Sequence, residues 1–297
     1  MKPRHLLAFI LLGTIWSASF LWIKIAVAEI GPFTLVGFRV LFGALTAGLA
    51  TVFARSAWPR DRGTWITYVI LGITSVAIPF LLISWGEQTI PSAVASILNA
   101  STPLFTIVIA HFLLRDDRMT VQRVIGVLAG FAGVVVLLSK DLQAGAQSSI
   151  LGQAAVIVAS LFYAASSIYA RRKTEHVPGL VRGAAPLVTA SLFMAAVIPA
   201  AEHPVRLPSL PITWVALLWL GALGSGLALI LWYYLLHAIG PTRTALVSYI
   251  FPLGGVLLGV LFLGETLTWQ LFLGAVFIVV SVVVVNWQGK KTKSKVE

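Results

Sequence analysis

Residues 241–265, with the sequence PTRTALVSYIFPLGGVLLGVLFLGE, decide the fold. From Thr244 to Gly264 this stretch carries no charged side chain, and Pro252 lies near its middle. A helix rises about 1.5 Å per residue, so a helix of this length crosses the roughly 30 Å hydrocarbon core of a bilayer. The stretch therefore predicts a membrane-spanning helix that begins at a proline and ends at a glutamate.

Residues 91–117, PSAVASILNASTPLFTIVIAHFLLRDD, repeat this plan with single-residue gaps. Pro91 corresponds to Pro241, Pro103 to Pro252, and Asp117 to Glu265. The segment that follows, MTVQRVIGVLAG from residue 119, matches LTWQLFLGAVFI from residue 267 at its Thr, Gln and Gly positions. A repeat of about half the chain is too long for a solenoid and is typical of a transporter with two halves.

Composition places the protein in a membrane. Of its 297 residues, 59% are hydrophobic and 10% are charged, whereas about 25% are charged in an average soluble domain. The absence of cysteine excludes disulfides and thiolate metal sites. The net charge of +11 arises from basic residues between the apolar runs, which favours cytoplasmic loops over a nucleic-acid-binding face.

Ten apolar segments are predicted to span the membrane as helices. They cover approximately residues 6–28, 33–54, 64–85, 92–114, 124–138, 150–170, 180–201, 212–236, 242–263 and 269–287. The polar connector 139–149 separates two repeats, which we place at residues 1–140 and 141–297. Because each repeat holds an odd number of spans, the second enters the bilayer upside down. The predicted fold is an all-α integral membrane protein of ten helices in two inverted five-helix repeats.

Basic residues predict the orientation. With the N-terminus inside the cell, 17 of the 21 Lys and Arg residues fall on cytoplasmic segments, and four do not: Lys24, Arg39, Lys140 and Arg206. We therefore expect both termini in the cytoplasm.

Several motifs resemble one transporter superfamily over essentially the whole chain. They are WSASF at 16–20 with Lys24, Gly31-Pro32 leading to Arg39, and the two proline-to-acid stretches at 91–117 and 241–265. In these features the chain resembles the drug/metabolite transporter superfamily, specifically its EamA-type members. It departs from that pattern at Arg115-Asp116-Asp117, where a Gly-Glu pair is typical, although a carboxylate still ends the span.

The resemblance implies a secondary transporter that exports amino acids or similar metabolites across a bacterial inner membrane by alternating access. Aromatic and hydrophobic amino acid exporters are the members it resembles most. The alternative is a carrier of hydrophobic or cationic drugs or of other metabolites, with or without proton coupling. The expected partners are a small-molecule substrate and the lipid bilayer, without nucleic acid. The oligomeric state stays open, with a monomer as one option.

Charged residues near the spans allow two interpretations. Lys24 and Arg39 lie off the bilayer centre, where a long basic side chain reaches toward the interface. One of them faces the cavity and attracts a substrate carboxylate, or both form structural ion pairs with Glu29 or Glu87. Asp117 and Glu265 are expected to cap or pair with helix ends, and His111 to be an interfacial polar group. The absence of Asp and Glu from mid-span argues against a pump for organic cations.

Neutral polar and aromatic residues near mid-span are the preferred candidates for substrate contact, because they orient amino and carboxyl groups while rings pack on an apolar side chain. Prolines inside spans kink the helix and free carbonyl groups that shape a cavity. The candidate substrate-binding residues are Trp16, Ser19, Lys24, Arg39, Pro79, Asn99, Pro103, Tyr163, Ser166, Ser248 and Tyr249.

No enzyme is predicted, and neither catalytic residues, cofactor nor metal is expected. The five histidines are scattered over different segments, whereas a membrane-embedded enzyme needs a cluster of such groups. Gly224-Ser225-Gly226 lies in an apolar span without the flanking strand that a dinucleotide-binding loop requires. A channel would show polar rings repeated along a pore, which these segments lack.

Overall fold

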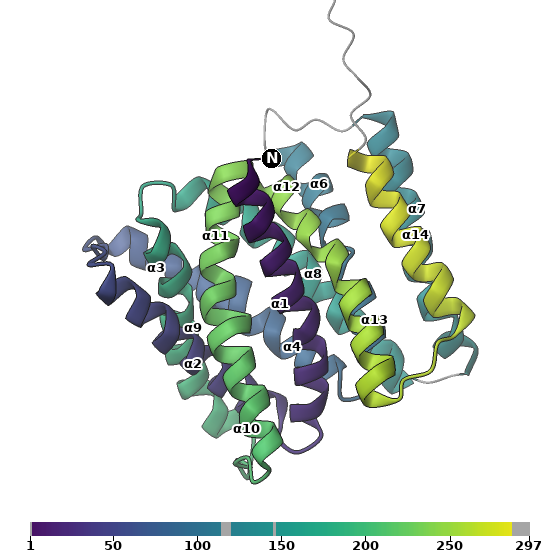
Figure 1. The fold of residues 1–297 in the computed structure, drawn as a ribbon, viewed down its shortest axis with the longest axis horizontal. Helices are drawn as coiled ribbons and strands as arrows, with labels where there is room; N and C mark the ends of the chain where they lie inside the picture. Colours follow the sequence, from purple (N-terminus) through teal and green to yellow (C-terminus); the bar gives the residue numbers. More distant parts are fainter. Residues whose placement is uncertain (1, 114–119, 145–146, 287–297) are drawn as a thin grey trace, which may run out of the picture.

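The computed structural model describes residues 2–113, 120–144 and 147–286, and these residues contain helices and no strand. The helices pack side by side into a single bundle (Figure 1). In the first part of the chain they are α1 (Pro3–Val27), α2 (Pro32–Phe53), α3 (Arg62–Leu71), the π-helix η1 (Gly72–Ala77), α4 (Ile78–Gly86), α5 (Ser92–Asn99), α6 (Thr102–Leu113) and α7 (Val121–Ala144). In the second part they are α8 (Gln147–Lys173), α9 (Gly179–Ala201), α10 (Pro211–Leu218), the π-helix η2 (Trp219–Leu227), α11 (Ala228–Ile239), α12 (Pro241–Ala245), the 3₁₀-helix η3 (Leu246–Tyr249), α13 (Ile250–Leu263) and α14 (Trp269–Asn286).

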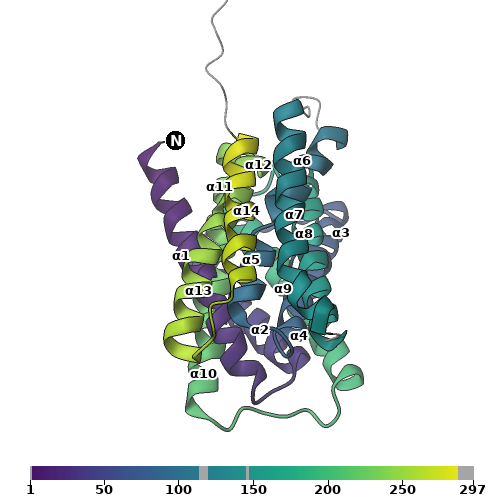
Figure 2. The same cartoon turned by 90° about the vertical axis from the view of Figure 1, so that its right-hand side faces the viewer.

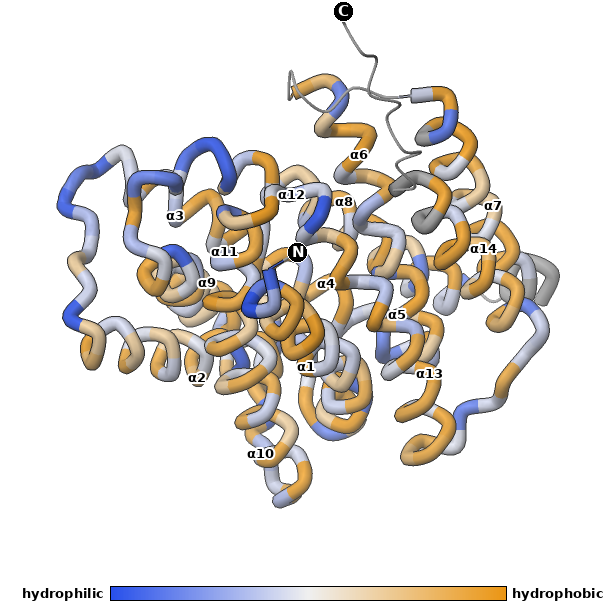
Figure 3. The backbone as a smooth tube through the Cα atoms, turned by 45° about the horizontal axis from the view of Figure 1, so that its top comes forward, coloured by the Kyte–Doolittle hydropathy of each residue, from blue (hydrophilic) through white to orange (hydrophobic). Residues whose placement is uncertain are grey.

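Eight helical runs of the described chain are long and apolar enough to cross a membrane, counting α3–η1–α4, α5–α6, α10–η2–α11 and α12–η3–α13 as one run each. Two shorter apolar stretches, Val124–Ser139 and Trp269–Ser281, lie within α7 and α14, which pack together at one edge of the bundle (Figures 1 and 2). Hydrophobic residues predominate along most of the helices (Figure 3). The expectation of an all-α, multi-pass membrane protein is confirmed.

Prolines mark where many of these helices begin. Pro3, Pro32, Pro211 and Pro241 each stand in the first turn of a helix, where the missing N–H has no helical partner to lose. Within the long runs, Pro79 lies just after the π-helix η1, whereas Pro186 and Pro199 lie inside the continuous helix α9.

The described part of the polar connector at 139–149 is helical, so the helix expected to end near residue 138 is longer than predicted. Helix α7 extends to Ala144 instead of ending near residue 138, and α8 starts at Gln147. The residues involved include Leu, Lys, Gln and Ala, which have high helix propensity, so polarity alone does not end the helix here. The placement of residues 145–146 and of Asp117 lies outside the described residues.

Helices from the two parts of the sequence interleave. Helix α2 packs against α9 and η2, α1 packs against α13 and α11, and α4 packs against α8. Glycines allow the close approach of α2 to η2, since a Cβ atom at Gly221 would come within 2.3 Å of the Phe42 side chain. The N-terminus and the end of α14 lie at the same end of the bundle, called the N-terminal end, and α10 begins at the opposite, far end (Figures 1 and 2).

A carboxylate from the first half caps a helix of the second half. Glu29, which follows α1, accepts hydrogen bonds from the backbone N–H groups of Ser209 and Leu210 and from the hydroxyls of Ser209 and Thr213. These groups form the start of α10. The Ser209 and Thr213 hydroxyl bonds are the main reason that the pKa of Glu29 falls to about 2.

Two carboxylates of the second half cap helices of the first. Glu202 accepts from the Phe33 and Thr34 N–H groups at 2.9 and 3.2 Å, at the start of α2. Glu265 accepts from the Ser92 and Ala93 N–H groups at 2.7 and 2.9 Å, at the start of α5. Each bond satisfies a backbone N–H group that has no partner within its own helix, and it places negative charge at the positive end of that helix. Three carboxylate caps therefore join the halves.

Candidate functional site: a central cavity

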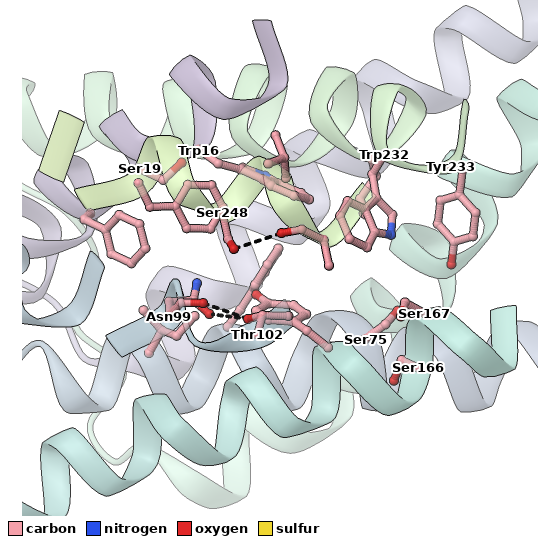
Figure 4. Close-up of a pocket in the computed structure, with 18 of the residues that line it drawn as sticks. Trp16, Ser19, Ser75, Asn99, Thr102, Ser166, Ser167, Trp232, Tyr233 and Ser248 are labelled. Atoms are coloured by element: carbon pink, nitrogen blue, oxygen red, sulfur yellow. Dashed lines mark hydrogen bonds between the residues drawn. The ribbon is translucent and has the colours of Figure 1, made fainter. Parts of the chain in front are cut away.

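A cavity in the middle of the bundle encloses about 830 Å³ of unfilled space, counting its open mouth. It brings together seven of the eleven predicted substrate-binding residues from several helices. Figure 4 draws Trp16, Ser19 and Ser248 on one side of the cavity and Asn99 and Thr102 on the other. The seven lining residues are Trp16, Ser19, Arg39, Asn99, Tyr163, Ser166 and Ser248.

Fourteen further lining residues were not singled out by the sequence. Most of them are apolar or aromatic, and so look like ordinary packing residues in a sequence of this composition. They are Phe20, Ile23, Ser75, Phe80, Ile83, Thr102, Ser167, Ala170, Leu229, Trp232, Tyr233, Ala245, Val247 and Phe251.

Helical periodicity, applied from Trp16 and Tyr163, finds four of these missed residues. The α1 lining residues Trp16, Ser19, Phe20 and Ile23 follow an i, i+3, i+4, i+7 pattern, which is one face of a helix. The α8 lining residues Tyr163, Ser166, Ser167 and Ala170 follow the same pattern, each 147 residues later in the chain. The two helices therefore present equivalent stripes to the cavity.

Lining residues on the other walls also form pairs at a constant separation in the sequence, here 149 residues. Phe80 and Ile83 of α4 are matched by Leu229 and Trp232 of α11. Asn99 and Thr102, at the break between α5 and α6, are matched by Ser248 and Phe251 at the break between η3 and α13. Equivalent positions of the duplicated sequence thus line one site.

Arg39 is the charged residue among the described lining residues. It comes from α2, its side chain is 3% exposed, and its Nε donates a hydrogen bond of 3.0 Å to the Ser225 hydroxyl. Its guanidinium carbon lies 3.6 Å from the centre of the Phe80 ring, in cation–π geometry. These contacts hold a planar cation at the cavity wall, a group suited to bidentate binding of a carboxylate.

An aromatic wall lies beside this cation. Trp16 donates its indole N–H to the Gly224 carbonyl at 2.9 Å, within the π-helix η2. Its ring centre lies 5.4 Å from that of Trp232 and 6.1 Å from that of Phe251. Such a surface binds a flat or branched apolar group by burial and ring packing.

Asn99 supplies the polar group at the break between α5 and α6. Its side-chain oxygen accepts hydrogen bonds from the Ser160 hydroxyl at 3.0 Å and the Thr102 hydroxyl at 3.3 Å. These bonds fix the orientation of the amide, whose oxygen then faces Ser160 and Thr102. The cavity therefore combines one fixed cation with neutral hydrogen-bonding groups and aromatic rings.

Lys24 does not line the cavity, which corrects one of its two predicted roles. Its ammonium donates to the backbone carbonyls of Glu87 and Ile90 at 2.5 and 2.9 Å. Lys24 thus holds the chain that follows α4, and within the described residues its ammonium makes no hydrogen bond to the Glu87 carboxylate. Of the two basic residues, Arg39 is the one that faces the cavity.

Pro79, Pro103 and Tyr249 lie next to the cavity without lining it. Pro79, just after η1, precedes the lining residue Phe80. Pro103, just after the break between α5 and α6, follows the lining residue Thr102. Tyr249 packs in a small cluster around Leu104, Ile107 and Val127, because the 3₁₀ geometry at 246–249 turns it away from Ser248.

The remaining interfacial candidates lie away from the cavity. Glu265 caps α5, as expected of a carboxylate near a helix end. His111 lies in the last turn of α6 with its ring 5.0 Å from that of Phe112. Within the described residues, no group of three or more His, Asp or Glu side chains is placed to hold a metal ion.

One further carboxylate lies at the end of α4, a helix that lines the cavity. Glu87 follows α4, one helical turn after the lining residue Ile83, and is fully buried. In the described part of the chain, neither of its carboxylate oxygens has a hydrogen-bond partner. Burial raises the pKa of the Glu87 carboxyl well above its ordinary value.

Comparisons with known proteins agree with this architecture. The chain is 25% identical over 282 residues to the uncharacterized transporter YoaV of Bacillus subtilis (strain 168), covering 93% of this chain and 94% of the relative. It is 28% identical over 292 residues to the uncharacterized inner membrane transporter YedA of Escherichia coli (strain K12), covering 96% and 93%. A solved crystal structure matches 96% of this chain and 98% of its own with a TM-score of 0.70 at 22% identity, a likeness of fold.

A family model matches the chain twice, once in each half. The matched residues are 4–139 and 150–287, and the model describes the EamA-like transporter family. Together the two matches cover nearly the whole chain. The chain therefore belongs to the EamA-like transporter family.

Proposed function

We propose that this transporter exports amino acids with aromatic or hydrophobic side chains by alternating access around the central cavity. The observation that carries the proposal is the buried Arg39 guanidinium, held beside an aromatic wall in a cavity whose described lining includes no carboxylate. A guanidinium group attracts a carboxylate, while Trp16, Trp232 and Phe251 suit an apolar side chain. Organic cations find no anionic partner there.

The framework we propose is ten membrane-spanning helices in two inverted repeats, residues 1–140 and 141–297. Two matched features besides the cavity support it. The π-helices η1 and η2 occur in corresponding runs, and in each run a tryptophan donates its indole N–H to a proline carbonyl six residues earlier, Trp65 to Pro59 at 3.0 Å and Trp214 to Pro208 at 3.2 Å. Transporters with inverted repeats bind their substrate near the middle of the bilayer, between the two repeats.

We further propose a bacterial inner membrane with both termini in the cytoplasm. The distribution of basic residues supports this orientation, as does the position of both described ends at one end of the bundle. YedA, a relative over almost the full length, is named as an inner membrane transporter. Under this orientation the far end faces the periplasm.

Counterflow uptake into liposomes that hold the purified protein tests the substrate class. Labelled tryptophan and leucine are compared with tryptamine, which lacks the carboxylate, and with indole-3-propionate, which lacks the ammonium group. We expect tryptophan to be taken up and tryptamine to be excluded. Uptake of tryptamine in place of tryptophan would contradict the proposal and favour a carrier of cationic drugs.

Arg39→Ala tests the role of the cation in the same assay. A hydrogen bond to a charged group contributes about 1.5–3 kcal/mol, so tryptophan uptake at low substrate concentration is expected to fall by about 10- to 150-fold. Arg206→Ala, at an exposed position in the loop before α10, is the matched control and should leave uptake unchanged. Equal uptake by the Arg39→Ala and wild-type proteins would remove Arg39 from the site.

A further inference from the structure

Glu87 is a buried acid that the transport site does not use. It follows α4 at the far end of the bundle, and its side chain is 0% exposed. Both carboxylate oxygens lack hydrogen-bond partners within the described residues. Burying an ionised carboxylate without hydrogen bonds is so costly that such a group binds a proton instead.

The charged neighbours of Glu87 are engaged elsewhere. On α1, Lys24 donates to the backbone carbonyls of Glu87 and Ile90, and on α2, Arg39 donates to Ser225 and stacks on Phe80. After α13, the Glu265 carboxylate accepts from the start of α5 and repels a second negative charge nearby. On α8, the titratable Tyr163 lines the cavity together with Arg39. The charges of Lys24 and Arg39 lower the pKa of Glu87, but burial outweighs them, and no described neighbour donates a hydrogen bond to its carboxylate.

We infer that Glu87 is a proton-binding site of the transport cycle, protonated while the far end is closed and deprotonated when that end opens. This inference rests on the proposed alternating access. The step is a simple ionisation: the carboxyl O–H bond breaks, the proton goes to water admitted at the far end, and the carboxylate keeps the electron pair.

The position of Glu87 links its ionisation to opening. Ile83, one turn earlier on α4, lines the cavity, and Phe20 and Ile23 line it just before Lys24 on α1. The Lys24 bonds to Glu87 and Ile90 tie α1 to the end of α4 below the cavity. Opening a path at the far end requires these helices to separate, which frees the Lys24 ammonium to pair with the newly charged carboxylate.

Thermal unfolding in detergent tests the proton site without any transport. A folded-state carboxyl whose proton is held more tightly than in the unfolded chain makes stability fall as pH rises above the ordinary carboxyl value. We expect Glu87→Gln to unfold at the same temperature as the wild type at pH 5 and at a higher temperature at pH 8. A lower unfolding temperature for Glu87→Gln at pH 8 would overturn the inference, because it would mean that an ionised Glu87 stabilises this conformation. Glu87→Met, which is also uncharged, is expected to lose the same pH dependence and guards against an effect of the amide itself.

Transport assays test the link to the cycle. The rate of tryptophan counterflow by the wild type should change between pH 5.5 and 8, whereas Glu87→Gln should give the same rate at both. Glu175→Gln, at an exposed position, is the control and should keep the wild-type profile. An unchanged pH dependence in Glu87→Gln would overturn the inference. If the unfolding experiment succeeds while no amino acid is transported by any variant, the proposed function fails and the proton site stands.

Discussion

Single carboxylates connect the two halves of this protein, and their surroundings decide their protonation. The Glu29 carboxylate accepts four hydrogen bonds at the start of α10 and has a lowered pKa, whereas the Glu87 carboxylate accepts none from the described residues and has a raised one. Hydrogen-bond donors stabilise the charged form and burial without donors destabilises it. The effects of these two glutamates on folding stability therefore change with pH in opposite directions, although both lie at the same end of the molecule.

Glu29→Gln is expected to lower the unfolding temperature at pH 7. Because the folded-state pKa of Glu29 is about 2, below the ordinary value of 4.5, its contribution is fully present above pH 4.5 and is lost as pH falls toward 2. Differential scanning fluorimetry of both proteins between pH 7 and pH 3 checks this. The gap between wild type and variant should narrow below pH 4.5, and a constant gap over this range would contradict the ionic origin of the cap.

At the residue scale, the sequence predicted seven of the lining residues, all polar or amphipathic, and missed the apolar ones together with the polar Ser75, Thr102 and Ser167. Trp16, Ser19, Asn99, Tyr163 and Ser248 stand out because they are polar or amphipathic within apolar runs. Phe80 and Leu229 do not, since nothing in their own identity separates a cavity wall from a packed core. The sequence could not show whether Lys24 or Arg39 faces the cavity, because this depends on the carbonyl groups and rings around each side chain, which come from distant parts of the chain.

At the scale of elements, irregular helix geometry surrounds the cavity. Pro79, Pro103 and Pro252 lie beside η1, the α5–α6 break and η3, so the expectation that prolines distort their spans agrees with the helix boundaries at these positions. Pro186 lies inside α9, which the structure describes as one continuous helix. The π-helix η2 contains no proline at all, and its three glycines pack against α1 and α2. A π-helix that depends on tertiary packing cannot be predicted from the local sequence.

Gly72→Ala is expected to destabilise the protein, because η1 packs directly on α9. An added Cβ atom would lie 2.1 Å from the Thr189 hydroxyl and 2.8 Å from the Pro186 carbonyl, and a backbone carbonyl inside a helix cannot move aside easily. Overpacking of this kind costs about 1–3 kcal/mol. Gly48→Ala is the matched control, since its Cβ meets nothing within 4 Å and alanine favours a helix over glycine by roughly 0.5–1 kcal/mol. Thermal unfolding should rank Gly48→Ala at or above the wild type, with Gly72→Ala below it.

At the scale of the whole molecule, the duplicated sequence predicted two halves, but the halves do not form two separate bodies. Helix α2 packs between elements of the second half, and α1 packs on α13. The repeat could be predicted because Pro91, Pro103 and their counterparts recur at nearly constant spacing. The packing of helices from one half between helices of the other could not be predicted, since it depends on which apolar faces fit together and the apolar runs are similar in composition.

The cysteine-free sequence makes the orientation directly testable. Gln88 is exposed at the far end and Lys173 is exposed at the end of α8, so Gln88→Cys and Lys173→Cys each introduce a single thiol. A membrane-impermeant maleimide applied to intact cells should label Gln88→Cys, and should label Lys173→Cys only after the membrane is permeabilised. The opposite pattern would place both termini outside.

The carboxylate caps between the halves also bear on how the chain is made. Helices α2 and α5 are synthesised early, yet Glu202 and Glu265, which cap them, are synthesised 169 and 173 residues after Phe33 and Ser92. At about 5–20 residues per second, the ribosome supplies those caps roughly 10–30 seconds later. During that interval the helix ends of the first half lie uncapped, so its final assembly waits for the second half to be synthesised, and we expect co-expressed separate halves to assemble into a working transporter.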